Sequence, residues 1–449
     1  MEKNLTTGSV WKNVLCFSLP YLLSYFLQSL YGMADLFITG QFNTTDSITA
    51  VSIGSQVMHM LTVMIVGLAM GATVNIGQAI GANDHEKAAA TIGNTVTLFM
   101  AVSLCTTALL IVLVRPIVSV MSTPAEAVNG TAQYLTVCFI GIPFITAYNI
   151  ISSIFRGLGD SKSPMYFVAV ACVANILLDY LFIGVLGLGP VGAALGTTLS
   201  QTISVIIALT AISRRKSAIA LDKGCFRPRR TVMKPILSVG VPVALQDGFI
   251  QIAFLLITVI ANRRGLDDAA AVGIVEKVIG FLFLIPSTML STVSALSAQN
   301  IGAGRHDRAL QTLGYAVMIC VGFGLAVALA IQFIAEPVVA LFDQTPNVVT
   351  AGGQYLRGYI WDCVFAGVHF CFSGFFCAYG KSGISFLHNT ASIVLVRVPG
   401  AYMMSKLFAH TLLPMGLAAA GGSLLSVLIC VAAFFCLRHR MPERRGAKA

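Results

Sequence analysis

The chain has 449 residues, of which 57% are hydrophobic and only 10% are charged, and its formal net charge is +10. A soluble domain carries about 25% charged residues, so this chain has too few to cover a globule of its size with a water-compatible surface. The composition excludes a soluble enzyme, a disordered protein and a nucleic-acid-binding protein, and it indicates a polytopic membrane protein.

Apolar stretches long enough to cross a bilayer, about 20 residues each, recur along the whole chain. The first six predicted spans lie at 14–38, 50–74, 89–114, 132–154, 164–186 and 190–212. The next six lie at 235–260, 269–294, 310–334, 354–378, 386–408 and 414–437. We therefore expect an all-α polytopic membrane protein with 12 transmembrane helices, in two six-helix repeats that form two lobes around a central cavity.

The basic residues predict how the chain lies in the membrane. Of the 28 Lys and Arg residues, 21 fall in the two tails and in the loops on the same side as the tails, and the loop at 213–234 alone holds eight. Because positively charged loops stay in the cytoplasm, we expect both termini there, in a bacterial plasma membrane. The expected parts are a tail at 1–12, a first lobe at 13–212, the basic loop at 213–234, a second lobe at 235–437 and a tail at 438–449.

The loop at 213–234 joins two copies of one unit. IGQAIGANDHEKA at 76–88 matches SAQNIGAGRHDRA at 297–309, and TPAEAVNGTAQYL at 123–135 matches TPNVVTAGGQYL at 345–356, at offsets of 221–222 residues. Each copy has an even number of spans, so the copies share one orientation. They should be related by an axis along the membrane normal, with a pathway at their interface, as in many transporters.

Ionisable residues inside spans cost about 2.5–3.5 kcal/mol each on insertion scales, so their presence needs a reason. Asp35, Asp179 and Thr197 fall at a similar depth, roughly 7–11 Å below the outer surface, and Asn175 shares a helix face with Asp179. Carboxylate and neutral oxygens suit Na⁺, and two close carboxylates also suit H⁺. The second half lacks this set, which favours an ion site over the alternative, a hydrogen-bond network between helices.

Six motifs resemble, in series, the multidrug and toxic compound extrusion (MATE) family. They are SLPYLLSYFLQSLYGMADLFITGQF, IGQAIGANDHEKA, FRGLGDSKSP, NILLD, GLGPVGAALGTTLSQ and LVRVPGAYMM. The resemblance, from about residue 12 to residue 437, implies two six-helix lobes, alternating access, and export of organic cations or other amphiphiles driven by inward H⁺ or Na⁺. The DinF-like branch implies that the coupling ion binds through Asp35, Asn175, Asp179 and Thr197.

The second half departs from the NorM-like branch, which carries acids in its seventh and tenth helices. Here the seventh helix offers Gln246 and Asp247 but no Glu at the matching place, and Asp362 of the tenth lies about one turn early. Glu276 is the remaining acid inside a span of this half. We predict that Tyr31, Gln246, Asp247, Glu276 and Asp362 line the substrate cavity.

A flippase for lipids or lipid-linked oligosaccharides is the alternative function. A pyrophosphate head group would need several basic residues inside the spans. The spans contain only two basic residues, Lys277 and Arg397, against five acidic residues. The sequence shows neither a nucleophile–base constellation nor a Walker motif, so we expect no enzyme activity. The expected partners are small amphiphilic or cationic substrates and membrane lipid, with no cofactor beyond the coupling ion, and we expect the protein to work as a monomer.

Overall fold

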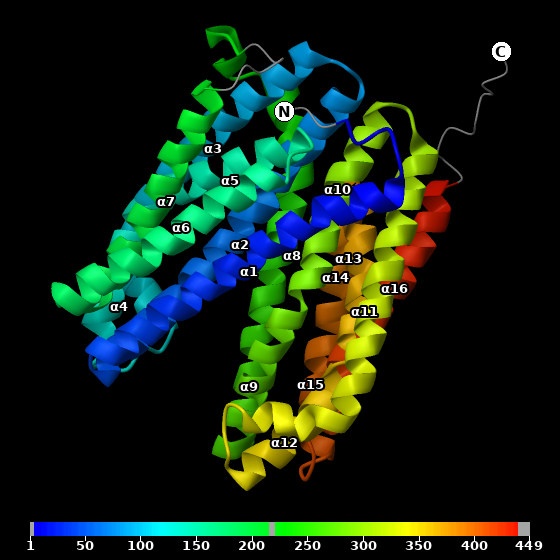
Figure 1. The fold of residues 1–449 in the computed structure, drawn as a ribbon. Helices are drawn as coiled ribbons and strands as arrows, with labels where there is room; N and C mark the ends of the chain where they lie inside the picture. The colour runs from blue at the N-terminus through cyan, green and yellow to red at the C-terminus, as the bar shows by residue number, and fades with distance from the viewer. Residues whose placement is uncertain (1–3, 215–220, 439–449) are drawn as a thin grey trace. The chain divides into compact units, whose positions relative to one another are not determined.

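The computed structural model describes residues 4–214 and 221–438, and every regular element in these ranges is a helix (Figure 1). The elements that cover the first six predicted spans are α1 (Val10–Phe42), α2 (Thr45–Gly81), α3 (His85–Val120), α4 (Val128–Ile140), α5 (Ile142–Gly157), α6 (Lys162–Asp179), η1 (Tyr180–Val185) and α7 (Gly189–Arg214). A short 3₁₀ helix, η2 (Lys223–Phe226), follows in the basic loop.

The elements of the second repeat follow the same order. They are α8 (Arg230–Asn262), α9 (Leu266–Leu282), α10 (Leu284–Gly302), α11 (His306–Ala340), α12 (Pro346–Tyr359), α13 (Asp362–Ala378), α14 (Ser382–Ser392), η3 (Ile393–Arg397), α15 (Val398–Leu407) and α16 (Leu413–Arg438). Side-chain caps begin some of these helices. Asp84, for example, accepts a 2.9 Å hydrogen bond from the Lys87 amide at the start of α3, which satisfies one free donor of the first turn.

Of the twelve predicted membrane spans, ten or eleven are found among the described residues, depending on whether one bent pair of helices is counted as a single span. Among the described residues, ten helices are long and apolar enough to cross a membrane, and α4 with α5, bent by 49°, makes an eleventh. The twelfth predicted span, 386–408, falls on α14, η3 and α15, which run without interruption from Ser382 to Leu407. This continuous helix is long enough to span, but it is not among the described helices that are also apolar enough to cross a membrane.

The described helices sort into two compact units. The first comprises residues 1–248, 291–312 and 378–380, and the second comprises 249–290, 313–377 and 381–449. This division cuts α8 after Gly248 and does not fall in the loop at 213–234. The lobe boundaries expected from the repeat therefore stay a prediction.

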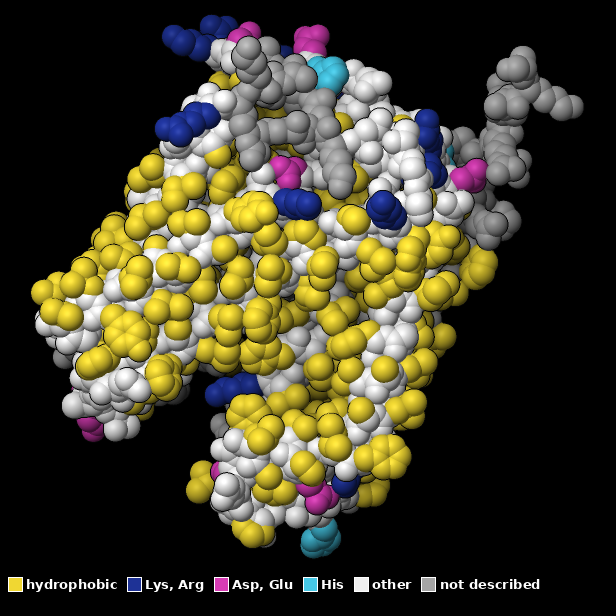
Figure 2. All heavy atoms as spheres, in the orientation of Figure 1, with side chains coloured by type: hydrophobic (Ala, Val, Ile, Leu, Met, Phe, Trp, Pro, Cys, Tyr) yellow, Lys and Arg dark blue, Asp and Glu magenta, His cyan; other side chains and the backbone are white. Residues whose placement is uncertain are grey.

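Each unit exposes apolar side chains to its surroundings. On α3 of the first unit Val112 is 77% exposed, and on α11 of the second unit Phe333 is 83% exposed. Figure 2 shows hydrophobic side chains over the middle stretches of the visible helices, with most charged side chains near helix ends. Such apolar surface is stable in lipid and unstable in water, and the protein is accordingly a multi-pass membrane protein.

Both units have an interior built around a tyrosine at matching repeat positions. In the first unit Tyr134 is 2% exposed and its hydroxyl lies 3.1 Å from that of Ser55. In the second unit Tyr355 is fully buried, and its ring meets that of Tyr359 at 5.5 Å between centroids. The close packing around these rings holds the helices that carry the polar side chains described next.

Candidate functional site

Two carboxylates, Asp35 and Asp179, lie beside each other in the interior of the first unit. Asp35 of α1 is 3% exposed, and Asp179, at the end of α6, is fully buried. Thr197 of α7 donates a 3.1 Å hydrogen bond from Oγ1 to Asp35 Oδ2. The side chains of Asn175 and Asp179 lie close to the Asp35 carboxyl group. The four residues grouped by depth in the sequence thus meet in one cluster, which we call the carboxylate cluster.

Most polar atoms of the carboxylate cluster have no hydrogen-bond partner within the described residues. They are Asp35 Oδ1, both carboxyl oxygens of Asp179 and both polar atoms of the Asn175 amide. An ionised carboxylate buried without a partner costs several kcal/mol, a cost that a proton or a bound cation removes. The cluster has the oxygen ligands that suit Na⁺ and two neighbouring carboxylates that can share a proton.

Gly196 brings α7 unusually close to the carboxylate cluster. A Cβ atom at this position would lie 2.0 Å from Asp179 Oδ1, far inside normal van der Waals contact. A side chain at this position would therefore push the Asp179 carboxylate out of its place where α7 passes the end of α6. Sequence reasoning did not single out this residue, although it lies within the glycine-containing motif GLGPVGAALGTTLSQ, directly before Thr197.

A π-helical turn adjoins an ionisable residue in each repeat. Asp179 directly precedes η1 in the fifth span, and Arg397 closes η3 in the eleventh. The turns are defined by amide bonds five residues apart, from Leu186 to the Leu181 carbonyl and from Val398 to the Ile393 carbonyl. Such turns are rare in proteins, and those that occur are often found at functional sites.

The residues predicted to line a substrate cavity are distributed over both units. In the first unit, Tyr31 precedes Asp35 by four residues on α1, Gln246 is 1% exposed, and Asp247 packs against Gly67. Within the described residues, Asp247 makes no hydrogen bond or ion pair. In the second unit, Glu276 accepts a 3.2 Å hydrogen bond from the Thr258 hydroxyl.

Asp362, the fifth of these residues, pairs with Arg397, a basic residue whose partner was not identified from the sequence. The carboxylate is fully buried and forms a short ion pair with Arg397, which is 7% exposed. The guanidinium also lies over the Tyr359 ring, 5.9 Å from its centroid. The Arg397 charge is thus already neutralised inside the second unit. A substrate-contacting role for Asp362 stays a prediction.

Two buried histidines in the second unit were not connected by sequence reasoning. His369 Nε2 lies 3.3 Å from the Ser423 hydroxyl, and His388 Nε2 lies 2.9 Å from the Ser373 hydroxyl. Their rings are 5.4 Å apart between centroids. Across the described part of the chain, no group of three or more His, Cys, Asp and Glu residues is placed to hold a metal ion.

The MatE family model matches the chain twice, at residues 20–181 and 242–403. Among curated proteins, the chain is 26% identical to the probable multidrug resistance protein YoeA of Bacillus subtilis, over 88% of this chain and 87% of that one. It is 28% identical to the probable multidrug resistance protein YpnP of the same species, over 90% of each chain.

The fold has a close counterpart among solved structures. A MOP superfamily transporter from Pyrococcus furiosus superposes with a TM-score of 0.89 over 97% of both chains, at 23% sequence identity. The likeness supports the all-α architecture with two repeats, and the two family matches begin 222 residues apart, at Pro20 and Pro242. Since these matches together cover more than half of its length, the chain belongs to the MatE family of multidrug and toxic compound extrusion transporters.

Proposed function

We propose that the protein is an antiporter that exports amphiphilic and cationic compounds by alternating access, driven by inward movement of H⁺ or Na⁺. The observation that carries the proposal is the carboxylate cluster, in which two buried acids have oxygens without partners within the described residues. Such a cluster gains free energy when it takes up a cation. A protein that binds the ion and the cargo with different affinities in two states can couple their movements.

The cargo class follows from the buried charges. Asp247 and Glu276 offer carboxylates that are not neutralised by a basic partner within the described residues, and both lie on spanning helices. A lipophilic cation binds favourably beside such a carboxylate in a low-dielectric site, because the attraction between the opposite charges is weakly screened there. These acids favour positively charged cargo, and several relatives carry names of multidrug exporters.

Transport by the purified protein in proteoliposomes tests this function. We expect ethidium to move against its gradient when a pH gradient or a Na⁺ gradient is imposed, and not in liposomes without protein. One charge moving down about 100 mV supplies about 2.3 kcal/mol, enough for a roughly fifty-fold concentration ratio. Imposing the two gradients separately identifies the ion. Ethidium movement that is equal with and without both gradients would contradict the proposal.

The flippase alternative is less favoured by the charges. A pyrophosphate head group needs several basic side chains inside the spans, and Arg397 is neutralised by Asp362. In the same proteoliposomes, we therefore expect a fluorescent lipid to cross no faster than in protein-free liposomes. Lipid crossing without ethidium transport would show that the protein is a flippase and not an antiporter.

We further propose that the protein lies in a bacterial plasma membrane with both termini and the loop at 213–234 in the cytoplasm. The exposed Lys223 of η2 is a suitable reporter position. In a background with Cys16, Cys105, Cys225 and Cys436 replaced by Ser, we expect Lys223→Cys to resist an impermeant thiol reagent added to intact cells. Glu126→Cys, in an exposed loop between α3 and α4, should react and serves as the control. Labelling of the cysteine at 223 but not at 126 would show that the topology is the opposite of the proposed one.

A further inference from the structure

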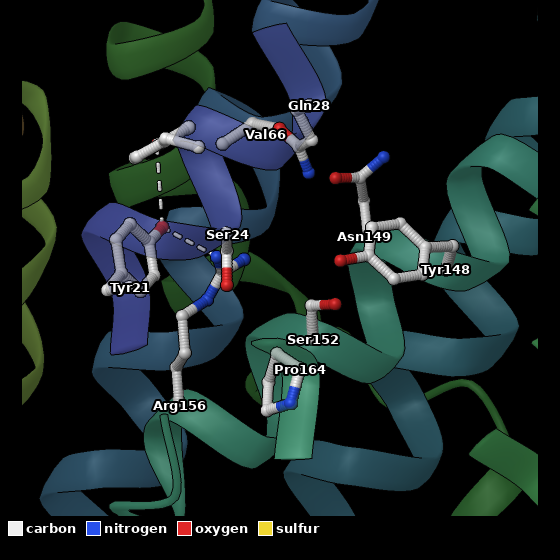
Figure 3. A pocket seen from close by; sticks show the side chains of 10 residues that line it. Tyr21, Ser24, Gln28, Val66, Tyr148, Asn149, Ser152, Arg156 and Pro164 are labelled. Carbon is white, nitrogen blue, oxygen red and sulfur yellow. Dashed lines mark hydrogen bonds between the residues drawn. The ribbon is translucent and has the colours of Figure 1, made fainter. Parts of the chain in front are cut away.

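A small pocket in the first unit surrounds one guanidinium group (Figure 3). It is lined by residues of α1, α2, α5 and α6, among them Tyr21, Gln28, Asn149, Ser152 and Arg156. Figure 3 shows the amides of Gln28 and Asn149 facing each other across the pocket, with Arg156 reaching toward Tyr21. On α1 the pocket is lined from Tyr21 to Gln28, and Gln28 lies seven residues, about 10 Å along a helix, before Asp35 of the carboxylate cluster.

The charge of Arg156 is not balanced by an acid. Its Nη1 donates a 2.5 Å hydrogen bond to the Tyr21 hydroxyl, its Nη2 a long one of 3.5 Å to Ser153, and its guanidinium carbon lies 4.8 Å from the Tyr21 ring centroid. All these partners are neutral, and the described residues provide no ion pair to Arg156. In contrast, Arg264, Arg357 and Arg397 each have a carboxylate partner.

A second group in the pocket also lacks a partner. Ser152 is 2% exposed, lines the pocket one helical turn before Arg156, and its hydroxyl makes no hydrogen bond to any described residue. A buried hydroxyl without a partner is unfavourable, because it has lost its hydrogen bonds to water and gained none in return. The pocket thus presents an unbalanced planar cation with several donors and a free hydroxyl, a combination suited to a carboxylate or a phosphate.

We propose that this pocket binds the oxyanion group of an amphiphile, so that the cargo range extends to zwitterionic and anionic compounds. The proposal rests on the proposed export function and adds a substrate class to it. The group that binds is a carboxylate or phosphate, carried by cargo or by the head group of a membrane lipid. Arg156 supplies charge and paired N–H donors, and Ser152 supplies a further hydrogen bond.

A matched pair of dyes tests the pocket directly. Rhodamine B has a free carboxylate and its ethyl ester does not, so their affinities for the full-length protein in detergent isolate the oxyanion. We expect Arg156→Gln to weaken binding of rhodamine B by about tenfold or more, as loss of a charge-assisted hydrogen bond does, and to leave the ester within about twofold. Arg156→Lys should recover part of the loss, and Ser152→Ala should weaken rhodamine B alone by about threefold.

Tyr21→Phe is the control for a purely structural role of Arg156. It removes the hydroxyl that holds the guanidinium and leaves the charge, so rhodamine B should bind at least as tightly as to the parent protein. The oxyanion site is refuted if Tyr21→Phe weakens the binding of both dyes to the same extent as Arg156→Gln. It is also refuted if Arg156→Gln weakens the binding of both dyes equally. The proposed export function would survive that result wherever the ester is still transported in the gradient assay.

A lipid titration separates the two sources of the oxyanion. Phosphatidylglycerol and phosphatidylcholine are added in turn to the parent protein carrying rhodamine B. Displacement by phosphatidylglycerol alone, absent in Arg156→Gln, would support a site that also takes lipid phosphate. Lack of displacement by either lipid, with the dye difference intact, would support a site reserved for the cargo carboxylate.

Discussion

Asp179→Asn is expected to abolish gradient-driven export while leaving the protein folded. The amide keeps the shape of the side chain but carries no negative charge and cannot take up and release a proton as a carboxylate does, so one of the two carboxylates of the cluster is lost. We expect ethidium accumulation in proteoliposomes to fall at least about tenfold, the factor that corresponds to about 1.4 kcal/mol of lost ion affinity. Glu126→Gln, which changes an exposed acid outside the spans, is the matched control and should transport normally.

A steric variant tests the same site by another route. In Gly196→Ala the new methyl group would lie 2.0 Å from Asp179 Oδ1, so the carboxylate must move away from its position beside Asp35. We expect a similar loss of gradient-driven transport. Gly322→Ala on α11, where the added carbon meets no atom within 4 Å, should have little effect. Normal ion-driven transport by the purified Asp179→Asn variant would show that Asp179 is not part of the coupling site, whatever the result for Gly196→Ala.

Arg397→Leu is expected to destabilise the protein severely, because it leaves Asp362 buried without its partner. Breaking a buried ion pair by removing one member typically costs about 3–5 kcal/mol. The free energy of unfolding, measured in detergent micelles, should fall by this amount. Arg357→Leu is the control: its ion pair with Glu336 has side chains that are 30% and 43% exposed, and exposed pairs contribute at most about 1 kcal/mol.

A double variant distinguishes loss of the pair from loss of packing. When Asp362→Leu and Arg397→Leu are combined, no charge is left buried alone, and an apolar replacement of a buried pair is often neutral or stabilising. We therefore expect the double variant to be more stable than either single variant. A double variant as unstable as Arg397→Leu would show that the Arg397 side chain stabilises the unit through packing and not through its ion pair.

Apolar length and repeated motifs were enough to predict the helical class, the duplication and ten or eleven of the spans. Depth along each helix was enough to group Asp35, Asn175, Asp179 and Thr197, because residues at one depth on adjacent helices can meet. The pairing of Asp362 with Arg397 was not predicted, since it depends on how the tenth and eleventh spans are rotated about their axes. The approach of Gly196 to Asp179 depends in the same way on the distance between two helices.

The π-helical turn in the eleventh span limits how far the faces of that span can be assigned from sequence periodicity. A π turn takes one residue more than an α turn, so residues beyond it are rotated by about 100° from the faces that a 3.6-residue period would assign. Periodicity read through Ile393–Arg397 therefore places the side chains of Val398–Leu407 on the wrong side of the helix, whereas Tyr180–Val185 is the last helical segment of the fifth span. A mutational scan along the eleventh span should therefore be interpreted separately before and after this π-helical turn.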